Sequence, residues 1–368
     1  RVSYGGSDSN ANTANILTMY ERDKAGRLVA VNYGDATRSE YFYDKLDRVT
    51  LVKKNGYEQY RNTYDNNGRI SVYNDMVTGI KREYNYDIIG RLESIVFGNN
   101  RLDYTYNNTN QLSKIKYTLN GQKRQTEYTY FKLGIPNTTM FGDGTAANTS
   151  TKSRTLDKLG RLSTEKITTP TNAEISTSYT YEDFDNSQQT GNRIKSINTP
   201  IGVAAYVHDS DGRVSGSELS GTNFSTGTMH QYDSLGRLIR DYASGPWWYY
   251  YDDSGNITRK WDMADRDISY EYTDSEWGDL LTKYDGTVIS YGVLGNPLNW
   301  RNGMSFTWEH EKRLSEIAQN GTQTASYTYD SAGLRSSKTV GGKTVTFEYV
   351  NKETRGRFSC LLFLTIRR

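Results

Sequence analysis

Polar residues alternate with aromatic or β-branched residues through most of the chain. Typical stretches are Glu40-Tyr41-Phe42-Tyr43 and Glu127-Tyr128-Thr129-Tyr130, in which two tyrosines are separated by one residue. Because side chains alternate between the two faces of a strand, both rings of such a pair project from the same face. Gly and Asn recur too often to leave an amphipathic window of about twelve residues uninterrupted. The pattern therefore predicts strands and no long helix.

A motif of the form Tyr-x-Tyr-Asp-x-x-Gly-Arg-Leu recurs along the chain, with a spacing of about 21 residues between marker tyrosines such as Tyr43 and Tyr64. Asp begins a tight turn by accepting backbone hydrogen bonds, and Gly three residues later supplies the positive φ that closes a hairpin with a bulge. Arg-Leu then begins the returning strand. The residues that we assign to this motif are Tyr43, Asp44, Tyr64, Asp65, Gly68, Arg69, Tyr86, Asp87, Gly90, Arg91, Asp157, Gly160, Arg161, Asp209, Gly212, Arg213, Tyr232, Asp233, Gly236, Arg237, Tyr251, Asp252, Gly255, Tyr329, Asp330 and Gly333.

A second turn signal lies between successive copies of the motif. It is often Asn-Gly, as at Asn55-Gly56, Asn120-Gly121 and Asn320-Gly321, which is the strongest short signal for a hairpin. Each period therefore contains a strand, an Asp turn, a returning strand and a second turn. The predicted fold is all-β, a long antiparallel meander of hairpins.

The repeats predict one continuous array over residues 16–350, after a polar lead-in at 1–15. The register weakens near 131–154, 183–192 and 215–227, where we expect longer loops, or alternatively linkers between sub-arrays. The tail 351–368 departs from the composition and the register. We expect a truncated or out-of-register end there, the alternatives being a strand that completes the sheet or a membrane-seeking segment.

Composition favours an extended sheet over a globule with a deep aliphatic core. Only 35% of the residues are hydrophobic, and 31 tyrosines make up a large part of them. The aromatic content of 13% and the net charge of +2 argue against disorder, and the same charge balance removes the electrostatic case for nucleic-acid binding. No signal peptide is visible at the start of the sequence, and the longest apolar stretch, Cys360-Leu361-Leu362-Phe363-Leu364, is too short to span a bilayer.

No set of side chains in the sequence forms a complete catalytic or metal-binding constellation. His208 and His230 fall in tyrosine positions of the repeat, and His310 falls in a turn. The turns that begin at Asp65, Asp209 and Asp252 offer oxygen ligands for calcium but lack the bidentate Glu of a tight site. We therefore expect no enzyme activity, no cofactor and no metal dependence.

Aromatic residues are the strongest candidates for ligand contact. Trp247, Trp248, Trp300 and Trp308 would form stacking platforms for sugars if their rings faced solvent. The competing interpretation is packing, because alternate aromatic residues along a strand point to opposite faces and pair with neighbouring strands.

The repeat resembles the YD repeat of the Rhs family, which includes bacterial wall-associated and polymorphic-toxin proteins, shell components of insecticidal toxin complexes, and the animal teneurins. The stretches Leu294-Gly295-Asn296-Pro297-Leu298 and Tyr327-Thr328-Tyr329-Asp330 resemble the region just before the core of Gram-positive members. The resemblance covers nearly the whole chain and implies hairpins that wind into a spiral, curved sheet enclosing a hollow shell. In the family a conserved core segment and a variable C-terminal toxin follow, but the expected core does not appear after Tyr349.

The resemblance implies a non-catalytic β-shell segment of a secreted or surface protein. Its partners would be the remainder of the same shell and a C-terminal effector used in interbacterial competition, at an extracellular or cell-surface location. The alternative is a carbohydrate- or cell-surface-binding module that uses exposed Tyr and Trp. On either interpretation we expect valine at Gly236, in a turn, to be costly, and alanine at Gly202, outside the motif, to be milder.

Overall fold

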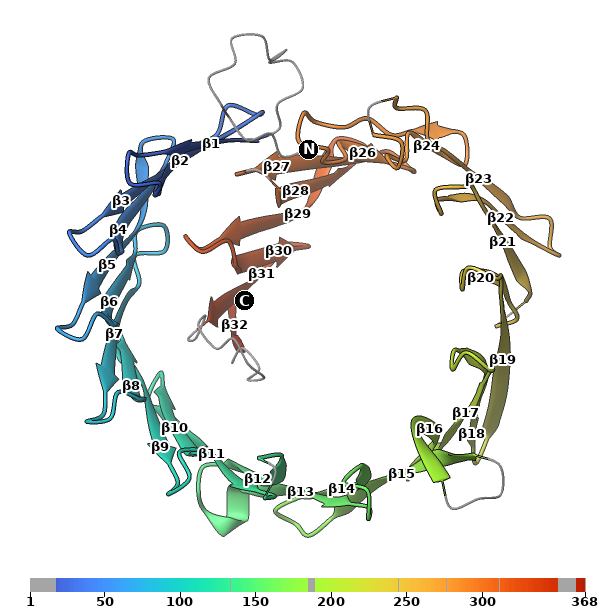
Figure 1. The fold of residues 1–368 in the computed structure, drawn as a ribbon, viewed down its shortest axis with the longest axis horizontal. Helices are drawn as coiled ribbons and strands as arrows, with labels where there is room; N and C mark the ends of the chain where they lie inside the picture. The colour runs from blue at the N-terminus through green and yellow to red at the C-terminus, as the bar shows by residue number, and fades with distance from the viewer. Residues whose placement is uncertain are drawn as a thin grey trace. The chain divides into compact units, whose positions relative to one another are not determined.

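The computed structural model describes residues 18–349, except 133, 185–188, 244, 276 and 311, together with residues 362–367. The polar lead-in expected at 1–15 lies outside the described residues. The described chain divides into two compact units, unit 1 (Arg1–Arg101 and Thr287–Arg368) and unit 2 (Leu102–Gly286). Both consist of antiparallel strands (Figure 1), so the all-β array of hairpins expected from the sequence is confirmed, as in a segment of a β-shell.

Unit 1 contains an N-terminal run of strands and a separate seven-stranded sheet. The N-terminal strands are β1 (Thr18–Arg22), β2 (Leu28–Tyr33), β3 (Arg38–Tyr43), β4 (Val49–Lys54), β5 (Tyr57–Tyr64), β6 (Ile70–Asp75), β7 (Lys81–Tyr86) and β8 (Leu92–Phe97). Each pairs antiparallel with the next. After the short β25 (Thr287–Val288), the seven-stranded sheet comprises β26 (Asn299–Trp300), β27 (Met304–Glu309), β28 (Arg313–Gln319), β29 (Thr322–Tyr329), β30 (Arg335–Val340), β31 (Lys343–Tyr349) and β32 (Leu362–Arg367).

Unit 2 continues the meander, and strand β9 (Asn100–Tyr106) crosses the boundary between the units. Its strands are β10 (Leu112–Leu119), β11 (Gln122–Tyr130), β12 (Pro136–Gly142), β13 (Ser150–Leu156), β14 (Leu162–Thr168), β15 (Glu174–Phe184), β16 (Gln189–Thr199), β17 (Gly202–His208), β18 (Val214–Gly221), β19 (Phe224–Tyr232), β20 (Leu238–Asp241), β21 (Trp247–Tyr251), β22 (Ile257–Asp262), β23 (Asp267–Glu271) and β24 (Lys283–Tyr284). One 3-10 helix, Ala146–Asn148, lies between β12 and β13. Successive strands follow a gentle curve within this unit (Figure 1).

The strand register confirms the turn chemistry expected from the motif. Pairing shifts by one residue at the marker tyrosine, for example between Phe42 and Tyr43 and between Gln231 and Tyr232. The residue three after the Asp has positive φ in these two turns, Gly236 with φ of 81° and, where the glycine is replaced, Asp47 with φ of 60°. The bulge and the left-handed glycine together return the chain into the next strand.

The two faces of the strands differ in exposure. Phe42 is 41% exposed and Tyr250 is 45% exposed, whereas the tyrosines on either side of each, such as Tyr41 and Tyr251, are partly buried. The marker rings therefore lie on one face, as expected from their alternation.

Buried apolar side chains are concentrated in unit 1. They include Ala30, Val31, Val52, Ile95 and Phe97 from the N-terminal strands and Ile289, Leu294 and Ala325 from the C-terminal part. Among the described residues of unit 2, the apolar residues in this class are Leu102 and Ile115. Unit 1 thus has more of a core than the single layer expected from composition, because two runs of strands meet within it.

Much of the three segments in which we expected longer loops is strand. Residues 131–154 contain β12 and most of β13, with a longer connection at 143–149 between them, and residues 215–227 belong mainly to β18 and β19. Strands β15 and β16 enter 183–192 on either side of 185–188, which lie outside the described residues. The sequence did not predict these strands because their Ser and Thr residues weaken the alternation of polar and apolar positions. The strands form nevertheless, since Thr favours an extended backbone and strand pairing uses only main-chain groups.

Gly202 is likewise not a neutral position. It begins β17, and a Cβ added there would lie 2.2 Å from the carbonyl oxygen of Ser220 on the paired strand. The milder effect expected for alanine at Gly202 is therefore wrong.

The end of the tail pairs with the sheet. The backbone of β32 lies antiparallel to β31, with Leu362 opposite Tyr349 and Arg367 opposite Thr344. This arrangement corresponds to the alternative in which the tail adds a strand, rather than to an end outside the register. The connection, residues 350–361, lies outside the described part of the chain.

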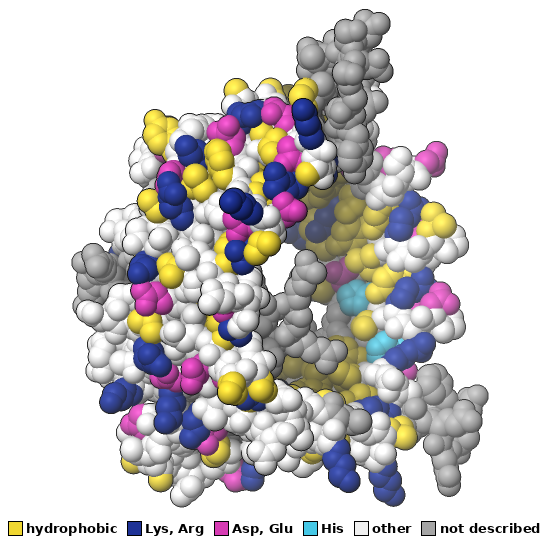
Figure 2. Space-filling model, turned by 60° about the vertical axis from the view of Figure 1, so that its left-hand side comes forward, with side chains coloured by type: hydrophobic (Ala, Val, Ile, Leu, Met, Phe, Trp, Pro, Cys, Tyr) yellow, Lys and Arg dark blue, Asp and Glu magenta, His cyan; other side chains and the backbone are white. Residues whose placement is uncertain are grey.

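Charged side chains of both signs are interspersed over the face seen in Figure 2, with apolar side chains between them and no continuous block of one sign. This distribution agrees with the small net charge of +2. No helix among the described residues is both long enough and apolar enough to cross a membrane.

Candidate functional site

Each Asp turn is closed by its own carboxylate. In the turn after β19, Asp233 Oδ1 accepts hydrogen bonds from the backbone N–H groups of Leu235 (3.0 Å) and Arg237 (2.9 Å). Asp233 Oδ2 accepts from Arg237 Nε at 2.7 Å. The backbone N–H of Gly236 donates to the Asp233 carbonyl at 3.0 Å, which completes the turn. The Asp, Gly and Arg of the motif therefore form one hydrogen-bonded unit.

The same unit recurs through both parts of the chain. Carboxylates accept from the backbone and from the guanidinium four residues later in the pairs Asp44–Arg48, Asp65–Arg69, Asp87–Arg91, Asp157–Arg161 and Asp209–Arg213. Two predicted copies depart from it. Asp252 binds the side-chain amide of Asn256, and Asp330 accepts from the backbone of Leu334, where the motif would have an arginine.

The marker tyrosine joins each repeat to the one before it. The Tyr232 hydroxyl donates to the carbonyl of Val214 at 2.8 Å, and the Arg213 guanidinium carbon lies 4.8 Å from the centre of the Tyr232 ring. Other hydroxyl-to-carbonyl contacts, between 2.6 and 3.1 Å long, are made by Tyr43, Tyr64, Tyr86, Tyr130, Tyr181, Tyr251, Tyr272 and Tyr329. Matching guanidinium–ring contacts are Arg27–Tyr43, Arg48–Tyr64, Arg69–Tyr86, Arg161–Tyr181, Arg237–Tyr251 and Arg313–Tyr329. We call this series of contacts the Arg–Tyr ladder.

Sequence reasoning missed further copies of the turn among the described residues. Asp23–Arg27 has the full geometry and is readable as Asp-Lys-Ala-Gly-Arg. Asp262–Arg266 lies in a turn of the other kind, from an even-numbered to an odd-numbered strand, and Asp265 with φ of 59° replaces the glycine. Asn107 and Gln111 form a neutral version through their side-chain amides. A search for the motif does not find the last two, because the turn at Asp262 lacks the Gly and the turn at Asn107 lacks the Asp.

The folded state favours the ionised form of the aspartates in these turns. The backbone N–H of Arg237, followed by its side chain, holds the pKa of Asp233 below its usual value, and the Arg48 guanidinium does the same for the pKa of Asp44. A lowered folded-state pKa contributes stability that is present above the unfolded value, 3.8, and is lost as pH falls through the folded value.

We therefore expect the melting temperature to be steady between about pH 5 and 8 and to fall steeply below about pH 4. Thermal unfolding followed by circular dichroism checks this. Asp233→Asn should reduce the size of the acid-induced drop, because one titrating group is removed. A melting temperature that stays level down to about pH 2 would contradict the role of the aspartates.

The histidines occupy the repeat positions assigned to them. His208 pairs with Val214 across its turn as Tyr43 pairs with Val49, and its Nδ1 lies 2.8 Å from Glu182 Oε1. His230 lies opposite Asp241, and His310 lies in a turn with φ of 45°. Among the described residues, no group of three or more His, Cys, Asp or Glu is arranged to hold a metal ion.

Two of the four tryptophans proposed for glycan contact lie under cationic groups. Lys260 Nζ lies 4.0 Å from the centre of the Trp247 ring, and the Arg266 guanidinium carbon lies 4.5 Å from it. Trp248 packs against Trp261 at 4.6 Å and has the Arg240 guanidinium over its ring at 4.4 Å.

The other two are in the seven-stranded sheet. Trp308 Nε1 donates to the Pro297 carbonyl at 2.6 Å, and Trp300 is partly buried in β26. The contacts of Trp247 and Trp248 support a role in cross-strand packing, the Trp308 ring is held by its hydrogen bond to Pro297, and glycan contact stays a prediction.

A buried polar contact joins the two parts of unit 1. Asp75, at the end of β6, is 2% exposed, and its Oδ2 accepts from the backbone N–H (3.1 Å) and the hydroxyl (2.7 Å) of Ser331. The Tyr73 hydroxyl lies 2.6 Å from Ser331 Oγ, and the Tyr73 ring stacks on Tyr60 with centres 5.2 Å apart. Burial raises the pKa of Tyr73 and raises that of Tyr60 to about 12. The Asp turn that begins at Asp330 is thus fixed to the N-terminal strands, which sequence reasoning did not foresee.

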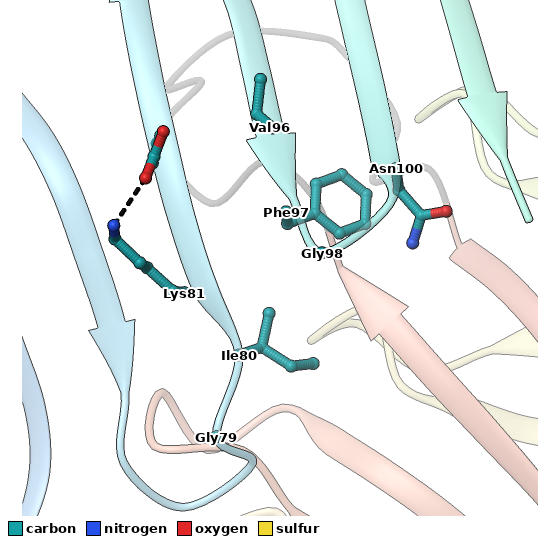
Figure 3. A pocket seen from close by; sticks show the side chains of 8 residues that line it. Gly79, Ile80, Lys81, Val96, Phe97, Gly98 and Asn100 are labelled. Atoms are coloured by element: carbon teal, nitrogen blue, oxygen red, sulfur yellow. Dashed lines mark ion pairs between the residues drawn. The ribbon is translucent and has the colours of Figure 1, made fainter.

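A cavity of about 490 Å³ opens beside β7 and β8 in unit 1 (Figure 3). It is lined by Gly79, Ile80, Lys81, Glu83, Val96, Phe97, Gly98 and Asn100. Ile80 and Phe97 point toward the gap, while Lys81 forms an ion pair with Glu83 at 2.6 Å. This lining can hold an apolar group, but its only ionisable pair is mutually neutralised.

Comparisons with known proteins detect a shared fold but no sequence family. No family model matches the chain, and no curated protein matches it. Among solved structures, that of TcdB2-TccC3-TEV matches with a TM-score of 0.57 and 15% identity over 91% of this chain. TcdB2-TccC3-Cdc42 and TcdB2-TccC3 without its hypervariable C-terminal region each match with a TM-score of 0.56, at 14% and 15% identity over the same share.

The chain spans only 20% of the length of each of these proteins. At this level of identity the likeness concerns the fold. The hairpin array described above is therefore similar in fold to a segment of the TcdB2-TccC3 chains.

Proposed function

We propose that this chain is a non-catalytic structural segment of the β-shell of a secreted or surface-displayed Rhs-type protein, and that the shell encloses or presents a C-terminal effector. The observation that carries the proposal is the fold likeness to TcdB2-TccC3, which extends over 91% of the chain. The YD-type motif, with its Arg–Tyr ladder, supports the same assignment independently of overall similarity.

The contacts of the Arg–Tyr ladder are of the kind that an extended shell wall requires. Each marker tyrosine binds the repeat immediately before it, as Tyr232 binds Val214 and Arg213, so the sheet can be extended repeat by repeat. The free energy of folding of such an array is approximately a sum of two kinds of contribution, the intrinsic stability of each repeat and the energy of its contact with the next repeat. The aspartate and arginine side chains of the motif, which are residue types that can act in catalysis, close the turns here.

The proposed partners are the remainder of the same shell and the effector that follows it. TcdB2-TccC3 has a hypervariable C-terminal region, and by analogy we propose that a variable domain is the cargo here. An extracellular or cell-surface location and a use in interbacterial competition complete the proposal, and both rest on the family resemblance of the motif.

Protection of the cargo tests this function. The natural full-length protein that contains this segment is treated with a nonspecific protease, and cleavage of its C-terminal domain is followed with time. A closed wall should slow that cleavage at least tenfold relative to the same domain produced alone, until denaturant opens the shell. Equal cleavage rates for the enclosed and the free domain would refute enclosure.

A further inference from the structure

One arginine of unit 2 has no acceptor for its hydrogen-bond donors among the described residues. Arg259, on β22, shows the usual arrangement, because its Nε and Nη2 donate to the two carboxylate oxygens of Asp267, both at 2.8 Å. For Arg240, on β20, the structure records neither a hydrogen bond nor an ion pair, and its Nε is buried without a partner. A guanidinium is always charged and carries five N–H donors, so burying part of it without an acceptor costs free energy. An acceptor from outside the chain would offset that cost.

Two aromatic rings hold the Arg240 side chain in place. Its guanidinium carbon lies 4.3 Å from the centre of the Tyr242 ring and 4.4 Å from the centre of the Trp248 ring. Rings at this distance attract the cation and cover part of the guanidinium plane. The two Nη groups are not among the buried atoms that lack a partner, so their N–H donors are open to solvent. These donors lie in one plane, which is the geometry that binds both oxygens of a carboxylate.

A continuous row of aromatic side chains adjoins this cation. Trp248 lies opposite Arg240 on the paired strand, and Trp261 lies opposite Trp248 on the strand after it. The centres of the two indole rings are 4.6 Å apart, so contacts run unbroken from Arg240 to Trp261. Tyr250, two residues after Trp248, projects from the same face and is 45% exposed. Asp267 lies opposite Trp261, but its ion pair with an arginine balances its charge. The row therefore presents one uncompensated positive charge beside an aromatic surface.

We propose that Arg240 and this aromatic row form a binding site for a carboxylated sugar, such as a hexuronic acid unit of an acidic polysaccharide. The Nη groups of Arg240 bind the carboxylate, and the C–H groups of the sugar ring pack on the exposed parts of Trp248, Tyr250 and Trp261. The inference goes beyond the shell proposal, because a wall does not require an anion at this place. It also narrows the expected glycan contact, since Trp247 projects from the opposite face and lies outside the site.

An acidic peptide is the competing ligand, because its side chains also carry carboxylates. Sheets commonly bind an extended peptide by adding it as a strand to a free edge. Strand β20 has no free edge, since it pairs with β19 on one side and with β21 on the other. A ligand of Arg240 must therefore lie on the face of the sheet, where aromatic side chains offer a surface for a ring.

Isothermal titration calorimetry with trigalacturonic acid tests the proposal on the full chain. Binding should saturate, and the methyl ester of the same trisaccharide should bind about tenfold more weakly or less, because its carboxylates are blocked. Triglutamate supplies the same kind of anion without a sugar ring. It should also bind about tenfold more weakly, because it cannot pack on the aromatic row.

Arg240→Gln should weaken the binding of trigalacturonic acid about tenfold or more. Arg240→Lys keeps the charge but not the planar pair of donors, and its affinity should lie between those of Arg240→Gln and the unchanged protein. The matched control is Lys260→Gln, which removes a cation of the same strands that has no recorded ion pair but lies over Trp247 on the other face. It should change the affinity by less than about twofold.

Melting temperatures of all variants separate a lost contact from altered folding. The proposal is overturned if trigalacturonic acid shows no saturable binding at about 10 mM. It is equally overturned if the methyl ester binds as tightly as the acid, or if Arg240→Gln and Lys260→Gln have the same effect. Triglutamate that binds as tightly as the trisaccharide, and loses its affinity in Arg240→Gln, would assign the site to an acidic peptide instead.

Discussion

Asp75→Ala should release the seven-stranded sheet from the N-terminal strands of unit 1 and lower the free energy of unfolding by about 3–5 kcal/mol. The Asp75 carboxylate is 2% exposed and serves four donors. Oδ1 accepts from the N–H groups of Val77 (3.0 Å) and Thr78 (2.9 Å), and Oδ2 accepts from the N–H and the hydroxyl of Ser331. Each buried donor left without an acceptor costs about 1–3 kcal/mol.

Urea unfolding followed by circular dichroism measures the loss, and limited proteolysis shows whether the C-terminal part of unit 1 is cleaved first. Asp35→Ala is the matched control, because the exposed Asp35 carboxylate also accepts a bond within a turn, from the Thr37 N–H at 2.9 Å, but makes no contact with the seven-stranded sheet that the structure records. It should cost less than about 1 kcal/mol.

Ser331→Ala should fall between the two, because it removes the hydroxyl and keeps the backbone donor. If Asp75→Ala unfolds within 1 kcal/mol of Asp35→Ala, the contact between Asp75 and Ser331 does not hold the two parts of unit 1 together.

The local structure of the repeat could be predicted because its causes are local. Asp233, Gly236 and Arg237 lie within five residues, and each is used as its chemistry suggests: the carboxylate as acceptor, the glycine at positive φ, the arginine at the start of the next strand. The alternation of tyrosines likewise placed their rings on one face. Strand pairing then followed from the shortness of the turns.

The partners of the marker tyrosines could not be predicted in the same way. That the Tyr232 hydroxyl reaches the Val214 carbonyl depends on how far successive hairpins are displaced along one another. No single repeat contains that information. The contact between Asp75 and Ser331 is harder still, because the two residues are 256 positions apart and Asp75 belongs to no copy of the motif.

The strands that occur where we expected loops have a related explanation. Strands such as β18 and β19 contain Ser, Thr and Gly at both exposed and partly buried positions, so the alternation of polar and apolar residues that marked other strands is weak. Their backbones pair regardless, for example Ser217 with Thr228 and Leu219 with Thr226. Main-chain pairing with a neighbouring strand on each side fixes these strands, although their side-chain pattern does not predict them.

Gly236→Val should be among the most damaging substitutions in unit 2, with a loss of about 2–3 kcal/mol. Gly236 has φ of 81°, where a side chain costs roughly 1–2 kcal/mol and a β-branched one costs more. A Cβ at this position would lie 3.4 Å from Arg213 Nη1, and that guanidinium packs over the Tyr232 ring. The valine branches extend beyond this Cβ on the side of Arg213, so besides straining the turn the substitution is expected to disturb the contact with the preceding repeat.

Gly278→Val is the appropriate control, because Gly278 does not have positive φ and a Cβ there would have nothing within 4 Å. It should change stability by less than about 0.5 kcal/mol, as surface substitutions usually do. Thermal and urea unfolding of both variants give the comparison. Arg213→Ala in the Gly236→Val background separates the two causes, since it removes the clash but leaves the backbone strain. If valine at Gly236 and at Gly278 cost the same, positive φ is not what makes glycine necessary in the repeat.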